Sequence, residues 1–191
     1  MRSATATSPL ASAPTTAAQA RIIEAALVLF ADHGISGTSL QMIADAVGVT
    51  KAAVYHQYNT KDEIVLAVAG IVLARLEAAV TRAEAERSRA RARELLIAAM
   101  IDLAVERRRM AGILQRDPVM LRFLEKHAPF RHVMRRVNRM LMGDAADPRA
   151  RVQAATLESL IAGTVVHRLV LNLDDQSLRT ELLKQARKLL R

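Results

Sequence analysis

A single glycine, Gly48, lies between two short stretches that each have the pattern of an amphipathic helix. In the stretch before it, Leu40, Ile43 and Val47 recur at the i, i+3 and i+7 spacing that places three apolar side chains on one face. Glycine adopts the left-handed backbone conformation that ends a helix at little steric cost. We therefore expect one helix to end at Gly48 and the chain to turn tightly there.

Capping residues predict where the helices around this turn begin. Thr38 and Gln41 have the spacing of a capping box, which would start the first helix at residue 39. Thr50 is a good N-cap for a second helix over residues 51–58. Thr60 and Glu63 form another capping box, so a further helix is expected to follow at once.

Two short helices joined in this way are typical of a helix-turn-helix unit, whose second helix lies in the DNA major groove. A plain helical hairpin within an all-α core is the alternative interpretation. The joint spacing of Ala44, Gly48 and Val54 favours the DNA-binding unit, because the small Ala44 allows the second helix to cross closely while Val54 anchors it.

The residues upstream and downstream extend this pattern. Residues 18–33 have the pattern of a strong amphipathic helix that ends at Gly34. The distinctive segments are Arg21-Ile22-Ile23-Glu24-Ala25-Ala26 through Phe30, His33-Gly34-Ile35, Thr38-Ser39-Leu40, Ile43-Ala44, Ala46-Val47-Gly48-Val49-Thr50-Lys51, Val54-Tyr55-His56, Tyr58 and Lys61-Asp62-Glu63. On these segments the chain resembles the tetracycline-repressor (TetR) family of bacterial regulators. The resemblance covers residues 21–63 almost without a gap, whereas the rest matches only in length and helical character.

The resemblance implies an all-α fold of two domains. A disordered N-terminal arm is expected over residues 1–17, a three-helix helix-turn-helix DNA-binding domain over 18–63, and a helical effector-binding and dimerisation domain over 64–191. The implied function is that of a ligand-responsive transcriptional regulator, most simply a repressor. Such a protein binds a palindromic operator in double-stranded DNA as a homodimer and is released by a small apolar or amphipathic effector.

The helix-turn-helix pattern and the resemblance together assign the DNA contacts. We expect Thr38, Thr50 and Lys61 to contact phosphates and Lys51 and His56 to reach base edges. The predicted DNA-binding residues are Thr38, Gln41, Thr50, Lys51, Ala52, Tyr55, His56 and Lys61. Because the alanine side chains on the reading helix are short, recognition is expected to depend on few side chains and on DNA shape.

The overall positive charge does not mark this segment as the DNA reader. The net charge is +9, but residues 1–61 hold four basic residues against three acidic ones. Most of the excess of arginine and lysine therefore lies in residues 62–191. A basic body attracts DNA at long range in a salt-dependent way, but it does not locate the contact surface.

Composition favours a helical protein of the cytoplasm. Hydrophobic residues make up 51% and aromatic residues 3% of the chain, a combination poor in the residue types that strands prefer. The absence of cysteine excludes disulfides and thiolate metal sites, and fits a reducing compartment. No run is expected to reach the length of a membrane span, and residues 1–17 lack the apolar core of a signal peptide.

The last two helices are expected over residues 148–171 and 177–191, each with one apolar stripe. The stripes can be buried within one chain or against a second copy, and the resemblance implies a four-helix bundle at a dimer interface. The predicted interface residues are Leu157, Leu160, Ile161, Thr164, Val165, Arg168, Leu178, Leu182 and Leu189.

An apolar cavity between the helices of the second domain would hold the effector. The predicted lining residues are Met100, Leu103, Met110, Leu114, Met120, Phe123, Met134 and Met140. Methionines at helical spacing also serve as ordinary core residues, which is the alternative interpretation of this set.

An enzyme is not expected, because no convergent set of titratable groups is visible. None of the five histidines stands in an i, i+4 pair, and no glycine-rich phosphate loop or nucleophile elbow is present. We therefore predict no catalytic residue, metal site or cofactor. The remaining alternatives are a helix-turn-helix activator or DNA-binding protein without an effector, and a helical protein-interaction module.

Overall fold

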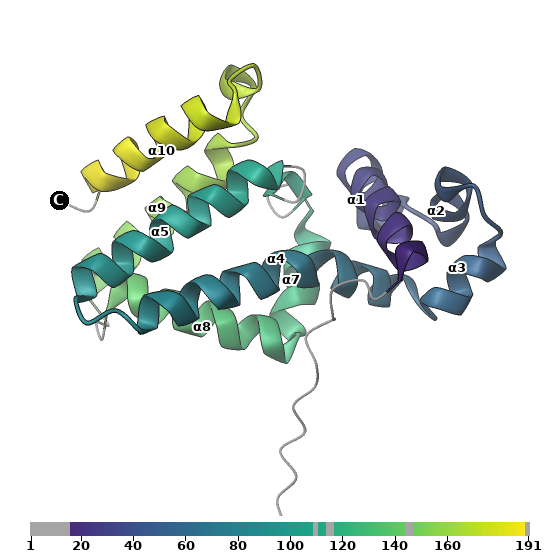
Figure 1. The fold of residues 1–191 in the computed structure, drawn as a ribbon, viewed down its shortest axis with the longest axis horizontal. Helices are drawn as coiled ribbons and strands as arrows, with labels where there is room; N and C mark the ends of the chain where they lie inside the picture. The colour runs from purple at the N-terminus through teal and green to yellow at the C-terminus, as the bar shows by residue number, and fades with distance from the viewer. Residues whose placement is uncertain (1–15, 109–110, 114–116, 144–146, 190–191) are drawn as a thin grey trace, which may run out of the picture.

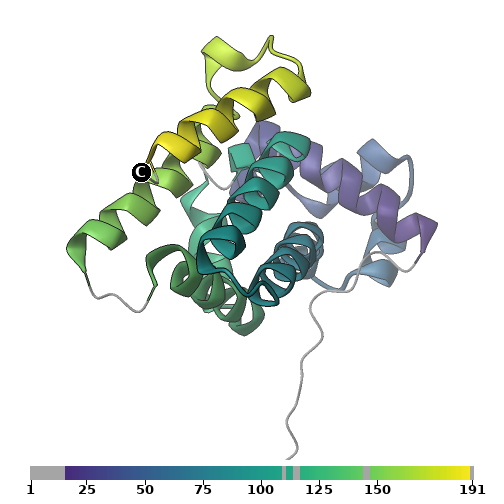
Figure 2. The same cartoon turned by 60° about the vertical axis from the view of Figure 1, so that its left-hand side comes forward.

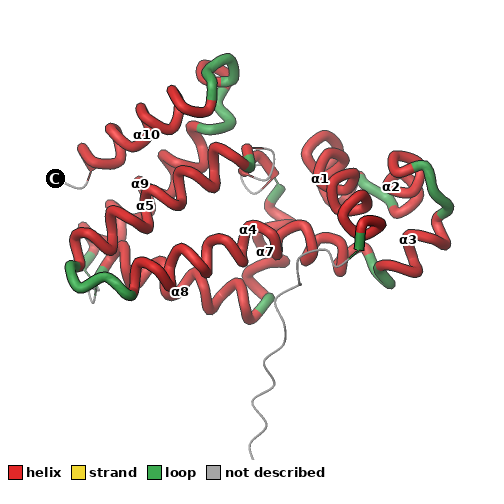
Figure 3. The backbone as a smooth tube through the Cα atoms, viewed as in Figure 1, coloured by secondary structure: helices red, strands yellow, loops and turns green. Residues whose placement is uncertain are grey.

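The computed structural model describes residues 16–108, 111–113, 117–143 and 147–189. Within these ranges the chain folds into helices joined by short loops and contains no strand (Figure 3). The elements are α1 (Ala17–Gly37), α2 (Leu40–Val47), α3 (Lys51–Gln57), α4 (Lys61–Glu84), α5 (Arg89–Glu106), α7 (Pro118–Lys126), α8 (Ala128–Met142), α9 (Pro148–Thr164), the 3₁₀ helix η1 (Arg168–Val170) and α10 (Asp175–Leu189). The all-α prediction is confirmed.

Helices α1–α3 gather at one end of the molecule, and α4 leads from them into a larger bundle of α5 and α7–α10 (Figure 1). Within the bundle, α5 packs against both α4 and α10, and α8 packs against α4 and α9. A view turned by 60° shows α5 in front, with α4 and α8 on one side of it and α9 and α10 on the other (Figure 2). The predicted arm over residues 1–17 lies almost wholly outside the described residues.

Side-chain hydroxyl groups cap the starts of α2, α3 and α4. The side-chain oxygens of Ser39, Thr50 and Thr60 each accept a backbone N–H from the third residue after them, at 3.1 Å. Two of these caps were predicted, but the cap of α2 was assigned to Thr38 and is in fact Ser39. Thr38 is buried instead, and its hydroxyl donates to the carbonyls of Leu29 and Gly34.

Gly48 has the predicted left-handed conformation, with φ 77° and ψ 39°. Its N–H donates to the carbonyl of Ala44 at 2.9 Å, and the N–H of Val49 donates to the same carbonyl at 3.0 Å. These bonds satisfy carbonyl oxygens that the end of α2 leaves without a partner within the helix. The turn between α2 and α3 is therefore fixed by backbone hydrogen bonds.

The long helix α4 belongs to two hydrophobic cores. Its first half, from Ile64 to Ala69, packs with Phe30 and Ile43 in the core of α1–α3. Its second half carries Leu73, Val80 and Ala83 into the core of the larger domain. The core of the first domain therefore continues along α4 beyond the predicted boundary at residue 63.

Among the described residues, α4 is the one helix long and apolar enough to cross a membrane by length and composition. The expectation that no run approaches such a span was wrong in that respect. Half of its most apolar 18-residue window is buried inside the protein. Its apolar character follows from packing in both cores, because a helix covered on several sides needs apolar residues around most of its circumference.

Two helices of the larger domain have bounds that differ from the prediction. The helix expected over residues 148–171 ends at Thr164, directly after Ala162 and Gly163, and a short 3₁₀ turn follows at Arg168–Val170. Glycine and threonine have lower helix propensity than the residues before them, which favours a stop at this point. The final helix begins at Asp175, two residues earlier than expected.

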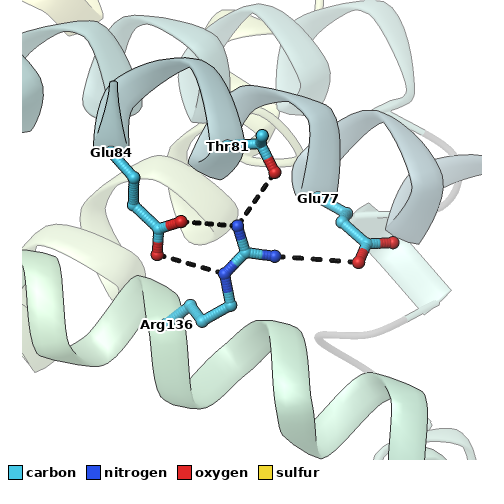
Figure 4. A network of polar contacts seen from close by, with 4 residues as sticks. All are labelled: Glu77, Thr81, Glu84 and Arg136. Carbon is cyan, nitrogen blue, oxygen red and sulfur yellow. Dashed lines mark hydrogen bonds and ion pairs between the residues drawn. The ribbon is translucent and has the colours of Figure 1, made fainter. Parts of the chain in front are cut away.

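Arg136 of α8 is held by three side chains of α4 (Figure 4). Its guanidinium donates to the Glu84 carboxylate at 2.6 and 3.1 Å and to the Thr81 hydroxyl at 2.8 Å, and Glu77 lies 3.7 Å away. The hydrogen bond from Arg136 keeps the pKa of Glu84 below its ordinary value, and the same bond raises the pKa of Arg136. This network joins α4 to α8 along their exposed side.

Replacing Glu84 by glutamine tests this network through its pH dependence. Because the pKa of Glu84 is lowered in the folded protein, its contribution is present above the ordinary value of 4.5 and disappears as the pH falls through the lowered pKa. At pH 7 we expect Glu84→Gln to lower the free energy of unfolding by about 0.5–1 kcal/mol, a small effect because the pair is partly exposed to solvent.

Urea denaturation at pH 7 and at pH 3 measures both values. The difference between wild type and variant should shrink at the lower pH. The exposed Glu125 is the matched control, and Glu125→Gln should show no such difference. An equal loss of stability at both pH values would show that the carboxylate charge of Glu84 does not stabilise the α4–α8 contact.

Candidate nucleic-acid interface

The exposed face of α3 carries side chains that can form hydrogen bonds and aromatic contacts. Val54 is fully buried and anchors the helix, while Lys51, Ala52, Tyr55 and His56 are exposed. The ammonium group of Lys51 lies 5.7 Å from the centre of the Tyr55 ring, within the range of a cation–π contact. The structure thus brings together the residues expected to read bases and keeps them on one face.

Thr50 is exposed at the start of α3, and its oxygen accepts the N–H of Ala53. A hydroxyl that accepts in a cap still has its own hydrogen, so Thr50 is able to donate to a phosphate. Ser39 has the same arrangement at the start of α2 and is also exposed. Sequence reasoning missed Ser39 because the neighbouring Thr38 was taken as the cap.

Three predicted DNA-binding side chains are engaged within the protein. Thr38 is 2% exposed, so its hydroxyl is not available for a phosphate. The ammonium group of Lys61 donates to the carbonyls of Ile35 (2.7 Å) and Thr38 (3.0 Å), which ties the start of α4 to the α1–α2 connection. Gln41 is exposed, but its amide donates to the Asp45 carboxylate at 2.7 Å.

Arg21 is engaged in a similar way, because its guanidinium donates to the carbonyl of Val47 at the end of α2, at 2.7 Å. Arg21, Lys51 and Lys61 are the basic residues of the small domain that lie within the described ranges. Of these three side chains, that of Lys51 alone makes no hydrogen bond or ion pair with another described residue. The ammonium group of Lys51, at the first residue of α3, is therefore the basic group of this set whose donors are all available for a contact with DNA.

The predicted effector-lining residues do not surround one cavity. Met120 and Phe123 pack with the core of α1–α3, whereas Met100 and Met140 pack with the core of the larger domain. Leu103 is buried and Met134 is partly buried. Met110 and Leu114 lie outside the described residues. The alternative interpretation of these methionines as core residues holds for Met120, which is fully buried.

The apolar stripes of the last two helices are buried within the chain. Leu157, Ile161 and Val165 of the α9 segment and Leu178 and Leu182 of α10 belong to the core of the larger domain. These side chains are covered by their own chain, so they present little surface to a second copy. Leu160, Thr164 and Leu189 are only partly buried, and Arg168 is exposed.

The described residues contain no group of three or more histidine, aspartate or glutamate side chains that could hold a metal ion. His127 is the histidine with an altered environment. Its Nδ1 atom is buried without a hydrogen-bond partner, and burial, together with the nearby Arg131, lowers its pKa.

Comparison with known proteins identifies the small domain. Residues 22–68 match the family model of the bacterial regulatory proteins of the tetR family. The N-terminal domain of the chain is therefore similar to the DNA-binding domain of TetR-family regulators. The match spans α1–α3 and the first turns of α4, which are the helices that share the core around Phe30.

Individual TetR-family proteins show how far the similarity extends. The probable acrEF/envCD operon repressor of Escherichia coli is 44% identical over 43 residues, which cover 22% of this chain and 20% of that protein. The aligned segment thus spans only about a fifth of the length of that relative. By name, that relative is a probable operon repressor.

Solved structures match over nearly the whole chain at low identity. The ketosteroid regulator KstR2 of Mycobacterium tuberculosis aligns with a TM-score of 0.70 and 17% identity, covering 92% of this chain and 96% of that one. SmeT in complex with triclosan aligns with a TM-score of 0.61 and 24% identity, covering 90% and 91%. These matches show that the second domain shares the TetR fold.

The hydrogen bonds of Lys61 predict a structural role that is separable from DNA binding. We expect Lys61→Met to lower the free energy of unfolding by about 1.5–3 kcal/mol, because two partly buried carbonyls lose a charged donor. The exposed Lys51 is the matched control, and Lys51→Met should change stability by less than about 0.5 kcal/mol. Urea denaturation followed by circular dichroism measures both, and similar values for the two variants would contradict the assignment.

Proposed function

We propose that this chain is a ligand-responsive transcriptional repressor that binds a palindromic operator as a homodimer. The observation that carries the proposal is the exposed face of α3, where Lys51, Tyr55 and His56 stand together on a helix fixed by Val54 and the Gly48 turn. Its site of action would be the DNA of the cytoplasm. The similarity to the named repressor of Escherichia coli supports repression over activation.

In the proposed complex, α3 lies in the major groove. Lys51 would donate to a guanine or a phosphate, His56 to a base edge, and Tyr55 would contact a phosphate or a thymine methyl group. Thr50 and Ser39 would donate their hydroxyl hydrogens to phosphates and so fix the register of the helix. With Arg21 and Lys61 engaged elsewhere, few side chains are left for base contacts, so DNA shape would contribute to selectivity.

A direct contact joins the two domains and offers a route for release. The N–H of Ile35, in the turn after Gly34, donates to the Asp117 carboxylate at 2.8 Å, immediately before α7. Met120 and Leu124 of α7 are buried in the core of α1–α3. A ligand that favoured a different position of α7 would therefore shift α1 and the reading helices. It would weaken DNA binding only by its difference in affinity for the two arrangements.

We place the proposed dimer contact on apolar side chains that are exposed in the single chain. Val152 of α9 is 66% exposed, and Leu169 and Leu171 beside η1 are 78% and 58% exposed. Leu169 and Leu171 lie close together in the chain beyond the end of α9, and exposed apolar side chains of this kind are typical of a protein–protein contact. A two-fold pair would set two α3 helices about one DNA turn apart, roughly 34–36 Å. The complex of SmeT with triclosan supports the proposal that a small molecule is the effector.

Operator binding is tested with a duplex selected by the wild-type chain from a random-sequence pool. We expect Lys51→Met and Tyr55→Ala each to weaken binding by about tenfold or more, because a good base contact is worth about 1–3 kcal/mol. If Lys51 contacts a phosphate, the slope of log affinity against log salt should also fall by about 0.9. Mobility-shift titrations at several salt concentrations measure both quantities.

The control for this experiment is Lys126→Met, which removes an exposed lysine from the last turn of α7. It should leave operator affinity within about twofold, which is the scale of long-range charge effects at moderate salt. Wild-type affinity in both α3 variants would refute the proposed interface. Equal losses in all three variants would show that binding follows net charge and not the α3 surface.

The dimer proposal is tested by placing a charge on the uncovered surface. Val152→Glu and Leu169→Glu should convert the dimer to a monomer without loss of helicity, because a buried unpaired carboxylate is costly at an interface. Light scattering coupled to size exclusion measures the mass. Leu95 of α5, 41% exposed, is the control position, and Leu95→Glu should remain dimeric. A dimer mass for both α9-side variants would place the contact elsewhere.

A further inference from the structure

A pocket of about 570 Å³ opens between the first turns of α5 and the last turn of α8. The first turn of α5 and the last turn of α8 lie at the end of the larger domain that is far from α1–α3 (Figure 1). Arg89 and Arg93 of α5 form one wall, and Met140, Leu141 and Met142 of α8 form the other. Its volume is in the range of small-molecule sites in proteins. Of the residues predicted to line an effector cavity, only Met140 is present.

Among the described residues, the two guanidinium groups in this pocket have no anionic partner. Neither Arg89 nor Arg93 makes a hydrogen bond or an ion pair with any other residue that the structure describes, and the buried Nε atom of Arg93 lacks an acceptor. The neighbouring acidic side chains are already engaged, since Glu86 pairs with Arg91 and Glu94 with Arg187. Buried polar atoms are rarely left unsatisfied, so the Nε atom of Arg93 requires an explanation.

The position of the two arginines is also unfavourable electrostatically. They stand one turn apart on α5, where like charges repel. The first turn of α5 contains no acidic residue, so its positive dipole end meets only cations. Burial, and secondarily the charge of Arg89, lowers the pKa of Arg93. A bound anion would relieve all three effects at once, because it would pair with both guanidiniums and face the start of a helix.

Capping of α8 is the structural alternative for these side chains. The C-terminal end of α8 faces the pocket, and its dipole attracts cations. The Arg89 guanidinium also packs directly over Gly143, where its Nη2 atom would lie 2.5 Å from a Cβ atom. Yet neither arginine donates to a carbonyl of α8 within the described residues. The cap thus accounts for the location of Arg89 but leaves the donors of Arg93 unused.

We propose that this pocket binds a small amphiphilic organic anion, with its head group on Arg89 and Arg93 and its apolar part against Met140 and Met142. Arginine pairs are suited to carboxylate and phosphate groups because the planar guanidinium donates two parallel hydrogen bonds. The flexible methionine side chains adapt to an apolar chain of varied shape. The site is distinct from the α3 surface, and its occupancy does not depend on DNA.

Isothermal titration of the full chain with octanoate, octanol and inorganic phosphate tests the proposal. Octanoate should bind in a saturable way, whereas octanol lacks the charge and phosphate lacks the apolar part, so both should bind more weakly by about tenfold or more. Arg89→Met and Arg93→Met should each weaken octanoate binding by about the same factor. Arg91→Met removes an equal charge from the same turn of α5 and is the matched control, expected to bind like wild type.

Thermal denaturation separates a binding role from a structural one. Without ligand, Arg93→Met should melt at or above the wild-type temperature, because it removes a partly buried guanidinium whose Nε atom has no acceptor. Octanoate should raise the melting temperature of the wild type and have little effect on Arg93→Met. A clear loss of stability in Arg93→Met, absence of saturable octanoate binding, or equal binding of octanol would overturn the proposal. Because no measurement contains DNA, this outcome is independent of operator binding.

Discussion

The structure depends on the sharing of one helix between two hydrophobic cores. The first half of α4 completes the core of α1–α3, and the second half completes the core of the larger domain. This sharing explains why α4 is apolar around most of its surface and why its composition resembles that of a membrane span. It also means that the two domains are not independent bodies on a flexible linker. A displacement of α4 in one core must be accommodated in the other, because packed interiors deform little.

Several polar side chains of the small domain hold its own backbone in place. Hydroxyls of Ser39, Thr50 and Thr60 start three helices, and Arg21 and Lys61 close the ends of others through carbonyl oxygens. This arrangement leaves a reading surface with little charge, concentrated at Lys51. A rigid but weakly charged surface favours recognition that relies on a few base contacts and on groove shape, in place of strong nonspecific attraction.

In the larger domain, by contrast, charged side chains pair with one another between helices. Ion pairs join α10 to α5 and α8 to α4, and they use most of the nearby acidic side chains. Arg89 and Arg93 take no part in these ion pairs. They lie at the N-terminal end of α5, where the positive end of the helix dipole disfavours cations. The Nε atom of Arg93 is buried without an acceptor in a pocket that this residue shares with Arg89, and a bound anion explains that arrangement better than folding does.

The amino-acid sequence by itself determined the local structure of the DNA-binding unit. Helix periodicity, Gly48 and the hydroxyl caps are encoded within a few residues, so the turn, the order of helices and the exposure of Lys51, Tyr55 and His56 were all predictable. The sequence did not reveal which polar residues turn inward. The burial of Thr38 and the hydrogen bonds of Lys61 depend on groups 23 to 26 residues away or on the bend at Gly34. Likewise, an apolar stripe such as Leu157–Ile161–Val165 has the same pattern whether it faces its own chain or a second copy, and only the packing of α9 against α8 and α10 decided that it is core.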